Sequence, residues 1–273
     1  MKAKKILFIT QEMIPFVPES ENALFGKNLP KSIQDNGHEI RTFTPKWGII
    51  NERRNQLHEV IRLSGMNIII DDTDHPLIIK VASLPQARMQ IYFIDNDDYF
   101  MKRMMDKDEN GIPYPDNGER AIFYARGVLE TVKKLRWTPD VIHCHGWISA
   151  IVPIYIKKAY NDEPSYANCK IVYSATEPEF QLDFGEHFLD CIKFKDIELD
   201  DLKEVFNGKY GFPELQKLAI KYSDGIILND KNVDKEVVDY ASSLAKPILG
   251  AEAKEDFKNT YAEFYETVMD YND

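Results

Sequence analysis

Residues 139–157 read PDVIHCHGWISAIVPIYIK, and this stretch decides the fold. An apolar run at residues 141–142 leads into the polar cluster HCHG at residues 143–146. Trp147 then opens a pattern with apolar residues at helical spacing, namely Ala150, Ile151 and Ile154. This order predicts a buried strand, a tight turn and a helix. Because ligands of open α/β sheets bind just beyond the carboxyl ends of the strands, function is first sought at this turn.

The flanking sequence predicts more strands and helices of the same kind. Residues 5–10, 21–36 and 38–44 form a β-α-β pattern, which implies parallel strands joined by a right-handed crossover. Short β runs between residues 57 and 100 predict a β-hairpin insertion, followed by a polar loop over residues 101–117. Further strands are predicted at 170–174, 225–228 and 247–249, and further helices at 116–132, 213–222 and 234–244.

The predicted fold class is therefore α/β, a single Rossmann-like domain with a mostly parallel sheet and a β-hairpin insertion. Residues 177–211 are expected to be an irregular acidic loop. The tail, residues 256–271, predicts an amphipathic helix with the aromatic stripe Phe257, Tyr261, Phe264 and Tyr265. We expect a main domain over residues 1–250 and a C-terminal helix within residues 251–273 that packs back on it.

The composition excludes several classes of protein. The net charge is −11, so nucleic acids and anionic membrane surfaces are poor partners. Cys144, Cys169 and Cys191 have no CxxC spacing, which argues against a disulfide framework. The apolar run at residues 6–9 is too short for a signal peptide, and no run approaches the ~20 residues of a membrane span. We expect a cytoplasmic protein that binds neither nucleic acid nor membrane.

Metal and cofactor motifs are weak. His143 and His145 alternate at a strand end and point to the same side, but no third ligand follows, so hydrogen bonding is favoured over a metal site. Asp71, Asp72 and Asp74 favour a solvated hairpin turn, since an EF-hand glycine and terminal glutamate are lacking. The sequence has no dinucleotide, P-loop or nucleophile-elbow motif. We therefore expect no metal and no cofactor.

Four carboxylates follow the predicted strand at residues 170–174: Glu177, Glu179, Asp183 and Glu186. Paired carboxylates can serve acid–base chemistry. An acidic surface loop is the more common use of such a run, and it is the interpretation favoured here.

Several segments, taken in order, resemble the N-terminal domain of bacterial glycogen and starch synthases, the glucosyltransferases that use ADP-glucose. They are residues 4–12 with Pro15 and Phe16, residues 29–31 with 37–41 and 45–48, the DNGER segment at 116–120, residues 139–147 with 152–157, and residues 222–225. Each segment alone is a weak signal. The ordered set covers about residues 4–245 and is fairly specific.

The resemblance implies one half of the GT-B architecture, in which two Rossmann-like domains enclose the active site and the second domain holds most of the sugar-nucleotide donor. This chain ends soon after the matched region. We therefore expect the donor domain to be absent, and the tail helix to cover the face that this domain would occupy.

The positions that match the family's functional residues are changed. The lysine and two glycines of the family's phosphate-binding turn fall on Pro18, Ser20 and Glu21. The aspartate of its His-Asp-Trp motif falls on Gly146, and the histidine of its His-Asn motif falls on Thr176. Glycine amides and a lysine favour a bound phosphate, whereas a glutamate repels it. The resemblance thus implies degenerate family positions and no working catalytic residue.

Three functions remain open. The leading hypothesis is a glycogen/starch-synthase-like protein that is catalytically impaired and binds an α-glucan, a malto-oligosaccharide or a protein partner. The alternative is active transfer of glucose from ADP-glucose or UDP-glucose to an α-1,4-glucan, with a partner chain supplying the donor domain. The third is a regulatory or scaffold protein that binds no sugar.

The candidate glucan-binding residues are aromatic or polar and belong to these motifs: Tyr114, Asp116, Asn117, Arg120, His145 and Trp147. Trp147 would stack on a pyranose face, although core packing explains it equally well. Asp116 or Asn117 would bind sugar hydroxyls. Asp116 also fits a helix N-cap in a capping box with Glu119, which is the commoner role.

Overall fold

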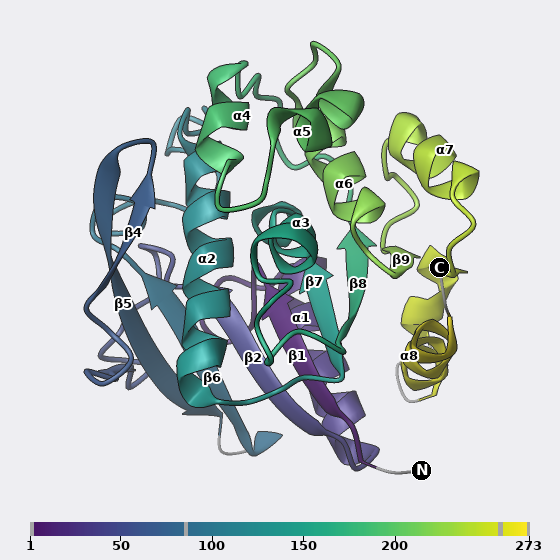
Figure 1. The fold of residues 1–273 in the computed structure, drawn as a ribbon. Coiled ribbons are helices and arrows are strands. Elements are labelled where there is room, and N and C mark those ends of the chain that lie inside the picture. The colour runs from purple at the N-terminus through teal and green to yellow at the C-terminus, as the bar shows by residue number, and fades with distance from the viewer. Residues whose placement is uncertain (1–2, 85–86, 256–258, 272–273) are drawn as a thin grey trace.

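The computed structural model describes residues 3–84, 87–255 and 259–271, and one large sheet organises them (Figure 1). The strands are β1 (Lys5–Thr10), β2 (Glu39–Pro45), β3 (His58–Glu59), β4 (Met66–Ile70), β5 (Thr73–Leu84), β6 (Met89–Asp95), β7 (Val141–His145), β8 (Lys170–Ala175), β9 (Gly225–Leu228) and β10 (Ile248–Leu249). Neighbours in the row β10-β9-β8-β7-β1-β2-β6 are parallel. β5 pairs antiparallel with β6, β3 and β4. The predicted mostly parallel α/β sheet with a hairpin insertion is confirmed.

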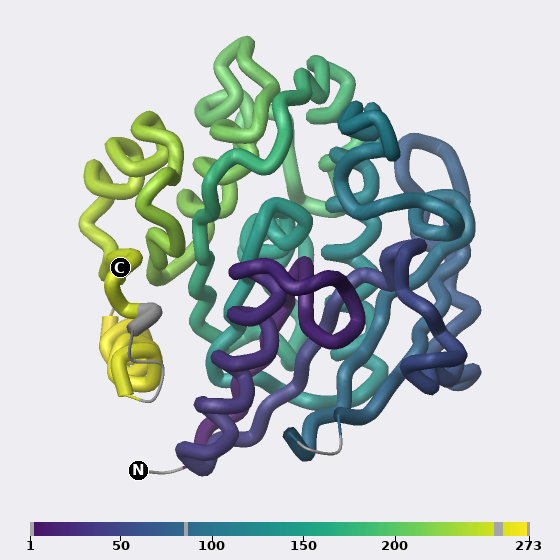
Figure 2. Tube along the Cα trace, turned by 180° about the vertical axis from the view of Figure 1, so that it is seen from behind, coloured from purple at the N-terminus to yellow at the C-terminus, as the bar shows by residue number. Residues whose placement is uncertain are grey.

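Helices cover both faces of this sheet. On one face lie α1 (Glu21–Asp35) and α8 (Thr260–Asp270), and on the other lie α2 (Asn117–Leu135), α3 (Val152–Ile154) and α6 (Phe212–Lys221) (Figures 1 and 2). The remaining helical segments are η2 (Trp147–Ser149), η3 (Tyr155–Ala159), α4 (His187–Ile192), α5 (Leu199–Phe206), α7 (Lys235–Ser243) and η4 (Ala251–Glu255).

The continuous apolar runs of the central strands follow from this double cover. On β1, Ile6 and Phe8 belong to the core beneath α1 and α8, whereas Leu7 and Ile9 belong to the core beneath α2. A parallel strand buried on both faces has no polar side to present to water, so its sequence does not alternate.

The sheet changes winding direction at β1. Strand β1 lies between β2 and β7, and the connections through α1 and α2 cross opposite faces. The chain therefore diverges beyond the carboxyl ends of β1 and β7, and a crevice at such a switch point is where open α/β sheets bind ligands.

Three local predictions are wrong. Residues 147–157 do not form one regular helix: they form η2, α3 and the start of the π-helical segment η3, with Pro153 in the first turn of α3, where its missing N–H costs no helical hydrogen bond. Residues 177–211 are not wholly irregular, since they contain α4 and α5. A β run predicted from Val60 is a turn, because β3 ends at Glu59.

The C-terminal helix α8 packs on the sheet with its aromatic stripe inward. Tyr261, Phe264 and Tyr265 are buried, whereas Phe257 lies outside the described residues. A Cβ at Gly225 of β9 would collide with Val268, so this glycine permits the close approach. α8 lies on the face of the sheet beside α1 (Figure 2), and the idea that the tail covers an interdomain face stays a prediction.

The division into a main domain over residues 1–250 and a docked C-terminal helix stays a prediction.

Among the helices of the described residues, none combines the length and the apolar character that a membrane span requires.

Candidate functional site at the carboxyl edge of the sheet

The turn after β7 has a backbone that only glycine adopts readily. Gly146 has φ 83° and ψ 171°, a region essentially closed to other residues. A Cβ at this position would also collide with Oε1 of Gln11, the first residue after β1. The aspartate that the family resemblance places here is therefore replaced by a bare backbone, and the side chain of Gln11 takes the space above it.

Gln11 bridges two carboxyl groups across the switch point. Its Nε2 donates to Oε1 of Glu12 at 2.9 Å and to both carboxyl oxygens of Glu179 at 2.8 and 2.7 Å. The other oxygen of Glu12 accepts a hydrogen bond of 2.7 Å from the Ser20 hydroxyl. We call Gln11, Glu12, Ser20 and Glu179 the edge cluster. It joins the loop after β1, the start of α1 and the segment after β8.

The backbone beneath the edge cluster is held rigidly from the core. Trp47 Nε1 donates to the Gln11 carbonyl at 2.6 Å, and the Tyr124 hydroxyl donates to the Thr10 carbonyl at 3.0 Å. Both donors are buried, on the segment after β2 and on α2. The end of β1 is therefore fixed before any ligand binds.

Glu179 has a strongly shifted acidity. Burial, and then repulsion from the Glu12 carboxylate, raise the pKa of the Glu179 carboxyl to about 8. Near pH 7 this carboxyl therefore keeps its proton. The expectation of an acidic surface loop holds for the exposed Glu177, Asp183 and Glu186, but it is wrong for Glu179, which turns inward onto Gln11.

His145 extends the site from β7 to β9. Its Nε2 lies 3.1 Å from Nδ2 of Asn229, its Nδ1 lies 3.5 Å from the Thr10 hydroxyl, and its ring stacks on Phe25 at 4.5 Å between centroids. His145 thus links Asn229 after β9 to Thr10 at the end of β1.

Three buried oxygens at this edge have no hydrogen-bond partner among the described residues. They are Oε1 of Gln11, Oγ1 of Thr176 and Oδ1 of Asn229. Each belongs to the first residue after a parallel strand, namely β1, β8 or β9. Buried polar atoms are nearly always paired, so three unpaired acceptors at one edge indicate a place where a ligand or water donates.

The other positions that the resemblance marks as changed are Pro18, Ser20, Glu21 and Thr176. Pro18 and Glu21 are exposed, and Ser20 is the N-cap of α1, where its Oγ accepts from the Ala23 N–H at 2.9 Å. Thr176 is buried, and its backbone N–H donates to the side chain of Gln216 at 3.0 Å. The helix N-terminus is thus already capped from within the chain.

Four of the predicted glucan-binding residues lie together at the loop over residues 101–117. Arg120 donates to Asn117 Oδ1 at 2.8 Å and to the Met105 carbonyl, and its guanidinium lies 5.1 Å from the centroid of the Tyr114 ring. Asp116 forms a paired hydrogen bond with Arg103 instead of capping α2. The capping box is therefore wrong, because an arginine from the preceding loop competes for the carboxylate.

Arg120 is unusually placed for a charged side chain. It is fully buried, and burial together with the nearby Arg103 lowers its pKa to about 9. With the buried Asn117, which donates to the Asp106 carbonyl at 2.8 Å, it fixes the loop from below. Only Tyr114 and Asp116 of this group are partly exposed.

Trp147 is in the core. It is 1% exposed, with the Phe180 ring edge-on at 5.0 Å and Trp47 at 6.4 Å between centroids. It therefore lies beneath the segment that carries Glu179 and offers no open face for stacking. His145 lies elsewhere, on the side of the sheet that faces α1.

Gln11, Glu12 and Asn229 were not chosen from the sequence. The available signal was their position, since Gln11 and Asn229 directly follow parallel strands. His143 shares a side with His145, as predicted, but hydrogen-bonds to Ser174 and Tyr265, each at 2.6 Å.

Comparisons with known proteins agree on one family. The profile of the starch synthase catalytic domain matches residues 5–249. The glycogen synthase of Chlorobium limicola is 37% identical over 169 residues, which cover 62% of this chain and 35% of that protein. The glycogen synthase of Chlorobaculum parvum is 31% identical over 240 residues, covering 85% of this chain and 47% of that protein. The chain thus spans about a third to a half of the length of these relatives.

A solved structure shares the fold. It is the catalytic domain of starch synthase IV from Arabidopsis thaliana bound to ADP and acarbose, with a TM-score of 0.70 and 16% sequence identity over 91% of this chain and 51% of that one. The family resemblance seen in the sequence is confirmed: this chain belongs to the starch synthase catalytic domain family.

Proposed function

We propose that this chain is a glycogen/starch-synthase-like protein that binds a neutral α-glucan at the carboxyl edge of its sheet and does not by itself transfer glucose. The observation that carries the proposal is the edge cluster, in which Gln11 bridges the carboxyl groups of Glu12 and Glu179. One member of the cluster, Ser20, falls on a glycine of the phosphate-binding turn that the family resemblance implies.

A sugar nucleotide is a poor ligand for this edge. Its diphosphate would approach Glu12 and the exposed Glu21 at the start of α1, and like charges at close range repel. The Ser20 hydroxyl, which caps the helix, is itself held by the Glu12 carboxylate. The dipole of the helix N-terminus, which favours anions, is thus already opposed by a carboxylate of the chain.

A glucan suits the same groups. Its hydroxyls bring donors without bringing charge, and hydrogen bonds from hydroxyls to carboxylates are short and strong. Gln11, Thr176 and Asn229 supply the unpaired acceptors. The names of the relatives, glycogen synthases, support an α-glucan as the ligand class.

In this proposal the predicted glucan-binding residues divide into two groups. Tyr114 and Asp116 are partly exposed and form the rim that a sugar would touch. Asn117, Arg120, His145 and Trp147 are buried and shape the edge from within.

Migration of the purified chain in native gels cast with and without glycogen tests the proposal. Retardation by glycogen but not by a β-linked glucan is expected. Glu12→Gln removes a charged acceptor and should weaken the apparent affinity about tenfold or more. Glu59→Gln, on the exposed strand β3 at the far edge of the sheet, is the matched control and should bind normally. Equal migration with and without glycogen would refute glucan binding.

A second candidate is glucosyl transfer with the donor site supplied from outside these residues. Glu179 favours it, because a carboxyl with a pKa of about 8 holds a proton at neutral pH and suits a general acid. Release of ADP or UDP from the sugar nucleotide that requires added glucan would support transfer. If Glu179→Gln abolishes this release of ADP or UDP and Glu177→Gln does not, Glu179 is the general acid.

A further inference from the structure

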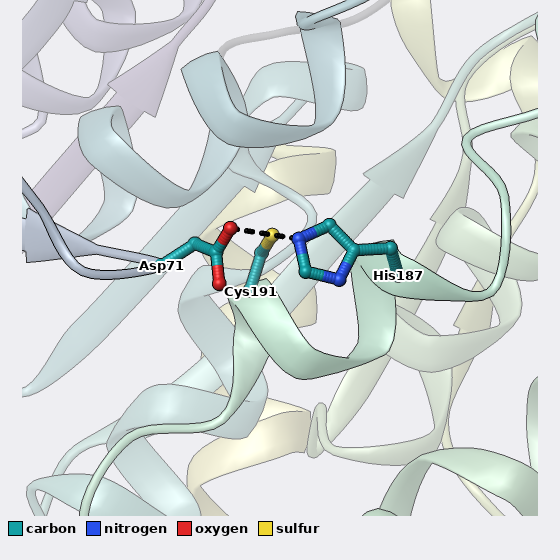
Figure 3. A group of neighbouring side chains, drawn as sticks. All are labelled: Asp71, His187 and Cys191. Carbon is teal, nitrogen blue, oxygen red and sulfur yellow. Dashed lines mark hydrogen bonds and ion pairs between the residues drawn. The ribbon is translucent and has the colours of Figure 1, made fainter.

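A second group of polar side chains lies away from the carboxyl-edge site, where the β4–β5 hairpin meets α4 (Figure 3). Asp71 is in the hairpin turn, with φ 44°, and His187 and Cys191 are on α4. Oδ2 of Asp71 lies 2.7 Å from Nε2 of His187, although the two residues are 116 positions apart. The carboxylate oxygen, the ring nitrogen and the Cys191 sulfur all lie within 4.8 Å of one another.

The local structure explains why these donors converge. His187 and Cys191 are four residues apart on one helix, so they share a face. Figure 3 shows both side chains directed toward Asp71 from the same turn of α4. The left-handed backbone of Asp71, in a two-residue turn between β4 and β5, places its carboxylate against that face.

The surroundings also suit a cation. The other ring nitrogen of His187 lies 3.8 Å from the Asp190 carboxylate, too far for a hydrogen bond but close enough to favour positive charge on the site. A cavity of about 50 Å³ adjoins the group and is lined in part by Glu119, His187 and Cys191. The carboxylates of Asp71 and Glu119 lie at the group and its cavity, and neighbouring negative charge favours a bound cation.

We propose that Asp71, His187 and Cys191 form a Zn²⁺ site, with ligation through Oδ2, Nε2 and Sγ and a water molecule at the fourth position. Oxygen, imidazole and thiolate donors together are a common zinc set, and three protein ligands with an open position are a common zinc geometry. On binding, His187 gives up the Nε2 proton that it shares with Asp71 and keeps its ring proton on Nδ1, and the Cys191 thiol proton passes to solvent. Oδ2, Nε2 and Sγ then each bind the metal. The ion ties the hairpin insertion to α4. This site does not depend on the proposed glucan function.

Zinc titration of the chelator-stripped chain, in competition with a chromophoric chelator, is the first test. One Zn²⁺ per chain is expected. Asp71→Asn and His187→Asn should each lower the zinc affinity at least about tenfold. Asp72→Asn in the same turn and His58→Asn on β3 are matched controls, exposed and outside the cluster, and should leave the affinity unchanged. No binding, or equal affinity in all four variants, would overturn the proposal.

Cobalt substitution tests the sulfur ligand separately. The Co²⁺-loaded chain should show a thiolate-to-cobalt charge-transfer band in the near ultraviolet, and Cys191→Ser should abolish it. Cys169→Ser, at another buried cysteine, should retain the band. A band that persists in Cys191→Ser, or that is absent from the unaltered chain, would contradict ligation by Cys191. Thermal unfolding in chelator establishes that each variant is folded.

Discussion

Two histidines on β7, two residues apart, show how differently the body and the edge of this sheet are built. His143 in the body is bonded to Ser174 on β8 and Tyr265 on α8, and burial holds its pKa well below the usual range. His145 at the edge lies among Gln11, Thr176 and Asn229, whose buried oxygens lack partners among the described residues.

This difference separates polar groups that stabilise the fold from polar groups that are available to a ligand. In the body, both ring nitrogens of His143 are used in hydrogen bonds that join β7 to β8 and to α8. At the edge, the residues that directly follow β1, β8 and β9 carry buried oxygens without a hydrogen-bond partner among the described residues. Unpaired buried acceptors cost stability, so three of them along one edge indicate that this edge binds a ligand.

The largest expected effect tests whether Trp147 belongs to the body. Trp147→Ala removes a side chain that is 1% exposed and should lower the free energy of unfolding by ~3–5 kcal/mol. Urea unfolding followed by circular dichroism measures it. Ile61→Ala, at an isoleucine that is 82% exposed, is the control and should cost little. A small loss at Trp147 together with weaker glucan binding would instead make it an exposed sugar platform.

The next effect concerns the shifted acid of the edge. In the folded chain the pKa of the Glu179 carboxyl is raised to about 8, whereas in the unfolded chain it has the ordinary glutamate pKa of about 4.5. A raised folded pKa gives stability that is present at low pH and is lost as the pH rises through 8. The unfolding free energy should therefore fall between about pH 5 and pH 8 by roughly 2–4 kcal/mol more than in Glu179→Gln.

Chemical unfolding at several pH values measures this difference. Glu177→Gln, at the exposed carboxylate two residues earlier, is the matched control and should follow the unaltered chain. Parallel pH profiles for the unaltered chain and Glu179→Gln would show that the Glu179 carboxyl is not buried against Glu12.

A smaller effect is expected in the body of the sheet. Tyr265→Phe removes the hydroxyl that pairs with His143 at 2.6 Å and leaves a buried ring nitrogen without a partner. The cost should be about 1–3 kcal/mol in the free energy of unfolding, with glucan binding unchanged. Lost glucan binding at unchanged stability would reverse the division between body and edge.

The smallest effect tests the pair between Asp116 and Arg103, which is present in place of a side-chain cap on α2. Asp116→Asn should lower the free energy of unfolding by about 0.5–1 kcal/mol, and the loss should shrink at high salt because the pair is partly exposed. Unfolding at low and high salt measures this loss. A neutral variant would contradict the pair, since asparagine caps helices as well as aspartate does.

The sequence predicted the fold well because the fold rests on local patterns. The buried runs of β1, β7, β8 and β9 and the turn at Gly146 are visible without coordinates. The family resemblance pointed to Pro18, Ser20 and Thr176 as changed functional positions, and this stays a prediction.

The contacts of the site were not predictable, because they join distant segments. Gln11 and Glu179 are 168 residues apart, and nothing local marks Glu179 as the one carboxylate of its loop that turns inward. Trp147 shows apolar spacing that fits a core or an exposed platform alike. Asp116 fits a helix cap until Arg103, from the preceding loop, is seen to hold it.

The central claim is that the acidic edge accepts a neutral glucan and rejects a sugar nucleotide. Calorimetric titration of the purified chain with a malto-oligosaccharide, and in parallel with ADP-glucose, tests it most directly. Saturable heat with the malto-oligosaccharide and none with ADP-glucose is the predicted result. Saturable binding of ADP-glucose, with no heat from the malto-oligosaccharide, would contradict the account.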